Sequence, residues 1–217
     1  MSCESTDRFC PLCRASEARP FYQDSRKYFR CPVCTLVFVL PYQFLSPKEE
    51  KSVYDLHDNS ANDPGYRRFL ARLFGPLSQR LAPNSCGLDF GSGPGPTLSV
   101  MFEEAGHPME VYDPFFAPET RPLQRQYDFI VASEVVEHLH YPRRELDRLW
   151  SCLKPNGLLG IMTKRVIDRE AFSRWHYKSD PTHVCFFSTE SFQWLADHWR
   201  SILTFLGKDV VLFTKTK

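Results

Sequence analysis

Apolar and polar positions along the middle of the chain follow two patterns. Over residues 65–83, apolar side chains recur at spacings of three and four, which predicts an amphipathic helix. Its apolar stripe consists of Tyr66, Phe69, Leu70, Leu73, Phe74 and Leu77. The segment CGLDF (86–90) is instead a short apolar run, typical of a buried strand. We expect the stripe to face a core rather than a ligand.

A second, shorter helix is predicted from residue 46 onward. Ser46 is a capping residue, Pro47 stands at the first helical position, and Glu49 and Glu50 lie in the first turn. Prolines 41 and 47 separate this helix from the preceding residues. The chain is therefore expected to consist of a small module (1–41), a helical connector or lid (42–83) and a main domain (84–217).

A glycine-rich loop follows the strand CGLDF. Gly91, Gly93 and Gly95 alternate with other residues, and a helix then opens at Pro96 and stops at Gly106. Glycine allows the main chain to approach a ligand closely, and the amides at a helix start favour an anion. A strand, a bare loop and a helix in this order predict a site for a nucleotide or a carboxylate.

Details of this loop favour a nucleoside without phosphates. A dinucleotide site requires a glycine where this chain has Pro96, and a P-loop requires a lysine and a hydroxyl where the chain reads GPTL. Asp113 ends the run MEVYD, 22 residues after Gly91, at the position where a carboxylate accepts both ribose hydroxyls.

Four of the eight cysteines have metal-ligand spacing. Cys10 and Cys13 form one C-x-x-C pair, Cys31 and Cys34 form another, and the 17 residues between the pairs are long enough for a hairpin. Four thiolates in this arrangement predict a structural zinc site, with a rubredoxin-type iron site as the alternative. The other cysteines are expected to be buried thiols; they are Cys3, Cys86, Cys152 and Cys185.

Residues 87–163 resemble the class I S-adenosylmethionine-dependent methyltransferases. LDFGSGPG is similar to their first motif, VYDPF to the acidic end of their second strand, and residues 127–163 to their fourth strand, the following helix and the Lys-Pro-x-Gly turn into the fifth strand. With the cysteine pairs and the later WHYKSDPTHVCFFS, the chain resembles small bacterial methyltransferases that carry an amino-terminal zinc ribbon.

The resemblance implies a fold and a set of cofactor residues. The fold is α/β, with a Rossmann-like, mostly parallel sheet and an antiparallel carboxy-terminal strand, and residues 201–216 read as two strands joined at a Gly-Lys-Asp turn. In S-adenosylmethionine, the methionyl part is implied to lie along Gly91, Gly93 and Gly95, and its amine to be held by Asp89. The ribose is implied to be held by Asp113, and the adenine to lie beside Phe115 or Phe116. Glu134 is placed at the same site.

The chain departs from the family in one segment. Only 15 residues, three of them proline, separate Asp113 from Phe129. We therefore expect the usual second helix and third strand to be shortened or absent.

Two later segments carry candidate catalytic groups. ASEVVEHLH is expected to start a helix beyond the fourth strand, with Glu134 and His138 on one face, so His138 either touches substrate or packs the helix. In WHYKSDPTHVCFF, Tyr177 or His183 is expected to orient or deprotonate the acceptor, with a loop anchor as the alternative. A metal triad of His176, Asp180 and His183 is disfavoured because Pro181 interrupts any helix that would align them.

Composition and charge narrow the partners. The 217 residues suffice for one main core with a small appendage, and 27 basic residues nearly balance 26 acidic ones, so bulk charge does not indicate an obligate nucleic-acid or membrane partner. No signal segment or membrane-length apolar run is present in the sequence, which predicts a cytoplasmic protein. The expected acceptor is a small molecule with an oxygen, nitrogen or carbon nucleophile.

Two alternatives stay open. The protein is an RNA methyltransferase if the zinc ribbon and the basic pairs at 67–68, 143–144 and 164–165 contact nucleic acid. It is a non-catalytic module if the ribbon serves only to bind a protein partner. An intact glycine loop and Asp113 speak against the second alternative.

Overall fold

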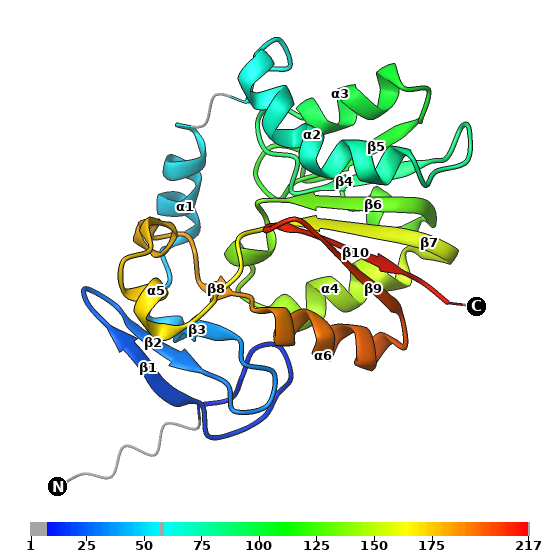
Figure 1. Cartoon of the computed structure of the whole chain (residues 1–217). Coiled ribbons are helices and arrows are strands. Elements are labelled where there is room, and N and C mark those ends of the chain that lie inside the picture. Colours follow the sequence, from blue (N-terminus) through cyan, green and yellow to red (C-terminus); the bar gives the residue numbers. More distant parts are fainter. Residues whose placement is uncertain (1–7, 57–58, 217) are drawn as a thin grey trace, which may run out of the picture.

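The computed structural model describes residues 8–56 and 59–216, with a six-stranded sheet at its centre (Figure 1). The strand order is β5-β4-β6-β7-β10-β9. The strands are β4 (Gly87–Phe90), β5 (Met109–Tyr112), β6 (Tyr127–Ser133), β7 (Leu153–Met162), β9 (Ile202–Leu206) and β10 (Val210–Thr214). The first four are parallel, whereas β10 is antiparallel to both of its neighbours. The predicted α/β fold with an antiparallel carboxy-terminal strand is confirmed.

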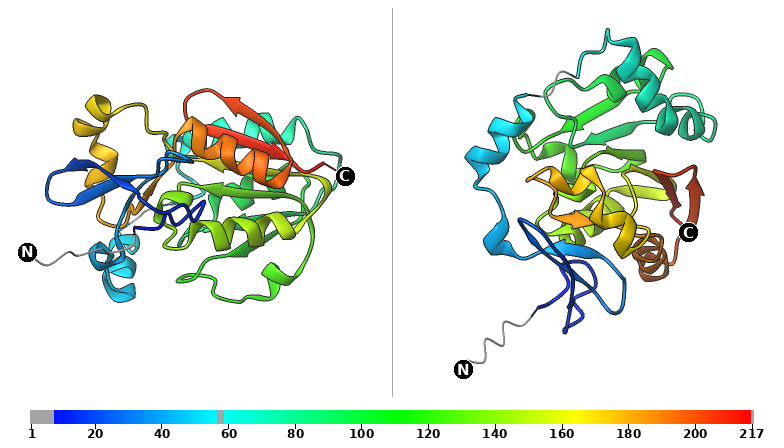
Figure 2. Two further views of the ribbon diagram at one scale, coloured as in Figure 1. Left: turned by 90° about the horizontal axis from the view of Figure 1, so that it is seen from below. Right: turned by 60° about the vertical axis from the view of Figure 1, so that its left-hand side comes forward.

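Helices cover both faces of this sheet (Figures 1 and 2). Alternate residues of β6 point to opposite faces: Phe129 and Val131 belong to one buried cluster, and Ile130 and Ala132 to the other. The first cluster contains residues of α2 (Pro64–Ser78) and α3 (Thr97–Glu104), and the second those of α4 (Pro142–Ser151) and α6 (Thr189–Trp199). Burial on both faces explains why the central strands read as continuous apolar runs.

The segment between β5 and β6 is as short as the sequence predicts. Its described structure consists of an isolated bridge between Asp113 and Ala117 and a 3-10 turn at Arg121–Gln124. Among the described residues, β5 is therefore the edge strand of the large sheet, and no α-helix or further strand of the sheet follows it before β6.

Residues 8–41, here called the cysteine module, contribute three of the four strands of a second sheet, whose order is β1-β2-β3-β8. Its strands are β1 (Arg19–Gln23), β2 (Lys27–Arg30), β3 (Val37–Val39) and β8 (Cys185–Phe186). The antiparallel pair β1–β2 is the hairpin expected between the two cysteine pairs. The fourth strand, β8, comes from the late part of the chain and pairs with β3. The cysteine module is thus packed against the segment that carries the candidate catalytic residues, as Figure 2 shows.

Side chains reinforce this contact between the cysteine module and the late segment. The Arg26 guanidinium donates hydrogen bonds to the backbone carbonyls of Asp180, Pro181 and His183, at 3.0, 3.2 and 2.9 Å, and also to that of Lys178. Ser191, at the start of α6, donates to the Cys34 carbonyl at 2.9 Å. The loop from 176 to 183 is therefore held in place by the amino-terminal module.

Two short helices lie outside the layers around the large sheet, and most of the unpaired cysteines described here are buried. Helix α1 (Pro47–Tyr54) begins at the expected capping residue Ser46, which forms a capping box with Glu49: each side chain accepts a hydrogen bond from the other residue's backbone amide. Helix α5 (Arg169–Ser173) lies near β1. Cys152 and Cys185 are buried as predicted. The prediction for Cys86 is wrong, because it lies before β4 at an exposed strand start, and Cys3 lies outside the described residues. None of the helices described here has the length and apolar character needed to cross a membrane.

Candidate functional site

A cavity of about 720 Å³ opens at the carboxyl ends of β4, β5 and β6. Open α/β sheets place their ligands at this edge because the loops after neighbouring parallel strands converge there. Its wall includes the glycine loop at 91–94, residues 112–116 after β5 and residues 133–135 and 138–141 after β6. Asp180 and His183 also line the cavity, as do residues from α1 and α2.

The glycine loop has no room for side chains at two of its positions. Gly91 adopts a left-handed φ of 77°, and a Cβ there would lie 2.5 Å from the Val135 side chain. At Gly95, a Cβ would lie 2.3 Å from the backbone oxygen of Asn59. The loop is therefore packed tightly between β6 and the segment that joins α1 to α2, with Gly91 and Gly93 lining the main cavity and Gly95 a smaller one.

Asp113 connects the end of β5 to the glycine loop. Its Oδ2 accepts a hydrogen bond from the Gly93 amide at 2.9 Å, and its Oδ1 accepts from the amides of Phe115 and Phe116 at 2.8 and 3.0 Å. The carboxylate is buried but lines the main cavity, as do both phenylalanines. A fixed acceptor at the strand end is suited to ligand hydroxyls.

Asp89 lies beneath the same loop. It is buried, and it accepts a hydrogen bond from the Ser99 hydroxyl at 3.0 Å. Burial raises the pKa of Asp89 to about 6, since desolvation disfavours its charged form. Asp89 lines a cavity of about 20 Å³ together with Gly91 and Gly95. A cationic group of a ligand at the loop would restore the charged state.

The structure corrects the helix expected at ASEVVEHLH. Glu134 has a left-handed φ of 54°, a single 3-10 turn covers Val136–His138, and α4 begins only at Pro142. Backbone groups that would hydrogen-bond within a helix bond to neighbouring segments instead. The Glu134 amide donates to the Met162 carbonyl at 2.7 Å, and the Glu137 carbonyl accepts from the Val184 amide at 2.8 Å. Glu134 and His138 both line the cavity, although they share no helix face.

His138 and His183 meet at one end of the cavity. Their ring centroids are 4.6 Å apart, in an edge-to-face arrangement. Nδ1 of His138 lies 3.2 Å from the Tyr54 hydroxyl, and Nε2 of His183 lies 3.8 Å from Asp180 Oδ2. Burial lowers the pKa of His183, which favours its neutral form. Both imidazoles thus belong to the same part of the cavity wall.

Tyr177 lies behind these histidines. It is buried and absent from the cavity wall, and its hydroxyl contacts Glu137 and lies 3.2 Å from both Glu134 Oε2 and Thr163 Oγ1. Burial, together with the two glutamates, raises the pKa of Tyr177 far above its usual range. The hydroxyl therefore acts as a hydrogen-bonding group between two carboxylates.

Glu137 is a site residue that sequence reasoning missed. Its side chain is fully buried, and burial raises its pKa to about 8, with the nearby Glu134 carboxylate adding to the shift. Thr163 donates a hydrogen bond to its Oε2 at 3.0 Å. The only signal in the sequence is a second acidic residue next to His138 in the run SEVVEH. His176, by contrast, is exposed beside Lys164, apart from the histidine pair.

Helices α1 and α2 contribute side chains that the sequence did not indicate. Leu70, Leu73 and Leu77 are buried as predicted. Tyr66 and Phe69, also expected in the core, are partly buried against it and line the main cavity as well. From α1 and the segment after it, the cavity receives Glu50, Tyr54 and Asn59. Helical periodicity identifies an apolar face, but not whether a protein core or a ligand covers it.

Contacts hold α1 against the site. His140 Nε2 lies 2.7 Å from Glu50 Oε1, and the Phe44 ring stacks on His140 with centroids 4.2 Å apart. After α1, the Thr97 hydroxyl donates to Asn59 O at 2.8 Å. Side chains of α1 and α2 and the residue Asn59 therefore form part of the cavity wall.

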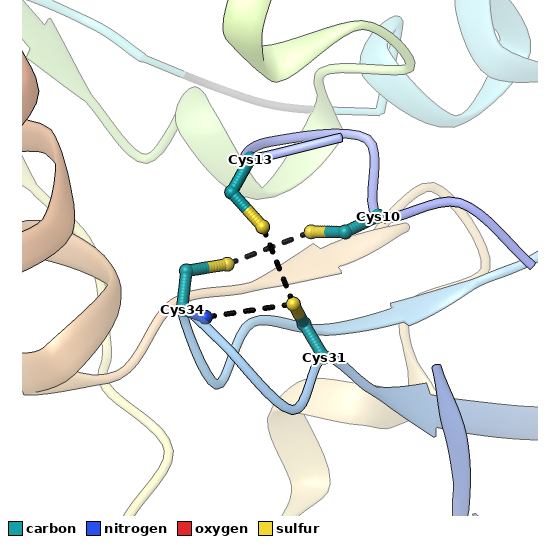
Figure 3. A group of neighbouring side chains, drawn as sticks. All are labelled: Cys10, Cys13, Cys31 and Cys34. Carbon is teal, nitrogen blue, oxygen red and sulfur yellow. Dashed lines mark hydrogen bonds between the residues drawn. The ribbon is translucent and has the colours of Figure 1, made fainter. Parts of the chain in front are cut away.

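The four paired cysteines point toward one another (Figure 3). Their sulfurs lie within 4.8 Å of one another, with separations of 3.5 Å for Cys10–Cys34 and 3.3 Å for Cys13–Cys31. A tetrahedral zinc ion with Zn–S bonds of about 2.3 Å places its sulfurs roughly 3.8 Å apart. The amides of Val33 and Cys34 also point at Cys31 Sγ, from 3.4 and 3.5 Å. The donor set fits a structural zinc ion.

Comparison with known proteins gives a family match and several structural similarities. Residues 62–198 match the family described as "Methyltransferase domain". No curated protein sequence matches the chain. Among solved structures, the Burkholderia thailandensis 1,6-didemethyltoxoflavin-N1-methyltransferase is 17% identical, with a TM-score of 0.52, over 92% of this chain and 100% of that one.

Two further structures have comparable scores. A putative methyltransferase from Haloferax volcanii, solved in complex with a methyltransferase activator, is 10% identical with a TM-score of 0.53, over 79% of this chain and 98% of that one. An O-methyltransferase family protein from Burkholderia thailandensis is 15% identical with a TM-score of 0.50, over 77% and 63%. At these identities the comparisons establish a shared fold.

Proposed function

The chain belongs to the methyltransferase domain family, and from this premise we propose that it methylates a small molecule held in the main cavity. It is an S-adenosylmethionine-dependent methyltransferase of class I, in agreement with the sequence motifs. The acceptor atom is an oxygen, nitrogen or carbon nucleophile.

The cofactor lies along the glycine loop in this proposal. Gly91, Gly93 and Gly95 contact its methionyl part, and Asp89, buried below the loop, pairs with its ammonium group. Asp113 accepts hydrogen bonds from the ribose hydroxyls, since its fixed carboxylate already faces the cavity. The adenine lies beside Phe115 or Phe116, and Glu134 contributes to the wall near the sulfonium.

The acceptor lies at the end of the cavity that holds the histidine pair. The sulfonium already makes the methyl carbon electrophilic, so the protein's task is to align the nucleophile with the methyl–sulfur bond and to exclude water. His138 and His183 line this end and orient the hydroxyl or amine that is methylated. Tyr177 is a positioning residue, because its hydroxyl holds Glu137 and its carbonyl holds His183.

The single observation that carries the small-molecule proposal is the cavity beside the glycine loop. Its volume is about 720 Å³, and its wall includes the glycine loop, side chains of α1 and α2 and both histidines. Pockets of about 300–1,000 Å³ are typical of small ligands. In support, the similar Burkholderia thailandensis enzyme was solved with bound 1,6-didemethyltoxoflavin and S-adenosylhomocysteine.

The cysteine module has a structural role in this proposal. A zinc ion bound by Cys10, Cys13, Cys31 and Cys34 leaves no coordination position for chemistry. The module instead supports the loop from 176 to 183 through β8 and Arg26. Of the basic pairs that favoured RNA, Arg67 and Arg143 form ion pairs with Glu104 and Asp147, which leaves less positive charge for a phosphate backbone.

An acceptor screen tests the proposal. The full chain is incubated with S-adenosylmethionine and a metabolite library, and in parallel with RNA, while S-adenosylhomocysteine release is measured. We expect release with one class of small molecule and none above background with RNA. A His183→Ala variant should lose most of that release and a His176→Ala variant none of it. Release with RNA alone would refute the small-molecule acceptor.

A further inference from the structure

Glu137, His138 and His183 form a group with metal-ligand chemistry that is separate from the cysteine site. One ligand atom from each side chain lies within 4.8 Å of the other two. Glu137 and His138 are adjacent in the turn after β6, whereas His183 comes from the loop before β8. Two imidazoles and one carboxylate are a recurrent ligand set for divalent transition metals.

The hydrogen bonds around His183 fix the tautomer that metal binding requires. Its Nδ1 donates to the Tyr177 carbonyl at 2.7 Å, so the lone pair of the neutral ring is at Nε2. Metal-binding histidines characteristically donate the other ring N–H to a backbone carbonyl or a carboxylate in this way. On His138, Nδ1 lies 3.2 Å from the Tyr54 hydroxyl, which fixes that ring in turn.

Glu137 is oriented in the same manner. Thr163 donates to its Oε2 at 3.0 Å, and the Tyr177 hydroxyl contacts its Oε1. Both carboxyl oxygens of the fully buried Glu137 are therefore held in place by neighbouring hydroxyls. A cation between Glu137 and the imidazoles would pair with the charged form of this side chain.

The position of this group relative to the cavity leaves room for a ligand. His138 and His183 line the wall, whereas Glu137 lies behind them, so an ion held by all three faces the cavity on its remaining side. Asp180 and Glu134 also line the cavity nearby and add negative charge. A three-ligand site with open positions is the arrangement of catalytic metal centres, unlike the closed four-cysteine site.

We propose that Glu137, His138 and His183 bind a divalent first-row transition-metal ion that coordinates a hydroxyl group of the acceptor. The assignment of that hydroxyl rests on the proposed function. Coordination lowers the pKa of the hydroxyl, and its proton leaves to water at the cavity mouth. The oxygen lone pair then forms the bond to the methyl carbon, and the methyl–sulfur bond breaks with its electrons on sulfur. The histidines act as ligands in this step rather than as bases.

Cobalt(II) is a suitable probe for this site. Full-chain protein with zinc in its cysteine site is equilibrated with cobalt(II), and bound cobalt and zinc are counted by elemental analysis while the absorption spectrum is recorded. We expect one equivalent of cobalt besides the zinc, without a thiolate charge-transfer band. Glu137→Gln and His183→Ala should each weaken cobalt binding at least about tenfold, and His176→Ala, a histidine of the same loop outside the group, should not.

The outcomes separate this inference from the proposed function. We expect both variants to keep the zinc content and the S-adenosylhomocysteine affinity of the wild type, which would show that the fold and the cofactor site persist. The metal site is refuted if the wild-type protein takes up no cobalt, if both variants bind it like the wild type, or if the bound cobalt shows thiolate bands. A failure of S-adenosylhomocysteine to bind the wild type would refute the proposed function instead, whatever the cobalt result.

Discussion

Asp113 accepts a hydrogen bond from the backbone amide of Gly93 at 2.9 Å, which joins the ends of β5 and β4 at the floor of the cavity. The contact links the two strongest motifs in the sequence, the glycine loop and the acidic residue 22 positions after Gly91. A ligand that hydrogen-bonds Asp113 therefore also meets the glycine loop.

Replacing Asp113 should weaken cofactor binding. In Asp113→Asn, an NH₂ group takes the place of one carboxylate oxygen and faces either the Gly93 amide or the two phenylalanine amides. Loss of a charged hydrogen bond costs about 1.5–3 kcal/mol, so the dissociation constant for S-adenosylhomocysteine should rise roughly 10- to 150-fold in calorimetric titrations. Asp128→Asn, at the opposite end of the sheet, is the matched control and should bind like the wild type.

The close approach at Gly95 predicts a second binding defect. A Cβ in Gly95→Ala would lie 2.3 Å from Asn59 O, so the segment after α1 has to move away from the loop. Overpacking of this kind typically costs about 1–3 kcal/mol, and we expect both the melting temperature and the cofactor affinity to fall. Gly75→Ala meets nothing within 4 Å on α2 and should leave both unchanged or raise the melting temperature slightly. Equal behaviour of the two variants would contradict the packing described here.

Cofactor affinity should depend on pH through Asp89. The pKa of Asp89 is raised to about 6 by burial, and the ligand ammonium pairs only with its ionised form. Affinity for S-adenosylhomocysteine should therefore be constant above pH 7 and fall below pH 6, approaching about tenfold per pH unit. In Asp89→Asn the affinity should be low and independent of pH from 5 to 8. An Asp89→Asn variant that retains the wild-type pH profile would place the titrating group elsewhere.

The raised pKa of Asp89 also affects the stability of the ligand-free protein. Because the folded pKa of about 6 exceeds the unfolded value of 3.8, the folded state binds more protons between these values. The contribution of Asp89 is therefore to lower the free energy of unfolding as pH rises from about 4 to 6. Denaturant unfolding of Asp89→Asn against wild type should show this difference across that window.

Loss of the metal from the cysteine site should destabilise not only the amino-terminal module but also the late segment that pairs with it. Cys31→Ser removes a ligand, and the module carries β3, which pairs with β8 next to His183. A loss of about 3 kcal/mol corresponds to a fall of roughly 6–12 °C in melting temperature for a chain of this size. Cys86→Ser, at an exposed cysteine outside the site, should melt within about 1 °C of wild type. If both serine variants melt together with wild type, the cysteine site holds no structural ion.

Tyr177 should influence the histidine site without touching a ligand. Tyr177→Phe removes the hydroxyl from Glu137 but keeps the carbonyl that accepts from His183. Second-layer changes of this kind lower metal affinity about 10- to 100-fold, so cobalt(II) binding should weaken while S-adenosylhomocysteine binding stays constant. Unchanged cobalt affinity in this variant would show that the Glu137 contact is dispensable.

Local chain features explain which parts of the site the sequence predicted. The glycine loop, Asp113 and the cysteine pairs depend on residues close in the sequence, and the structure places each in the expected element. Proline content likewise predicted the missing helix and strand after β5. Such features act through backbone dihedrals and spacing, which a single sequence displays.

Features that depend on distant partners were missed or mispredicted. Glu134 lies in a turn because its amide pairs with Met162, a contact that overrides the helical character of its neighbours. Tyr66 has the spacing of a core residue and does pack against the core, but its contribution to the cavity wall has no signal in that spacing. Strand β8 joins the sheet of the cysteine module from about 150 residues away, and no local pattern marks that pairing.

The most direct test of the account is the identity of the ligand at the glycine loop. Separate calorimetric titrations of the full chain with S-adenosylhomocysteine and with NAD measure it, each repeated on Asp113→Asn. We predict one equivalent of S-adenosylhomocysteine, bound more weakly by the variant, and no binding of NAD. Binding of NAD to the wild type without any binding of S-adenosylhomocysteine would contradict the account.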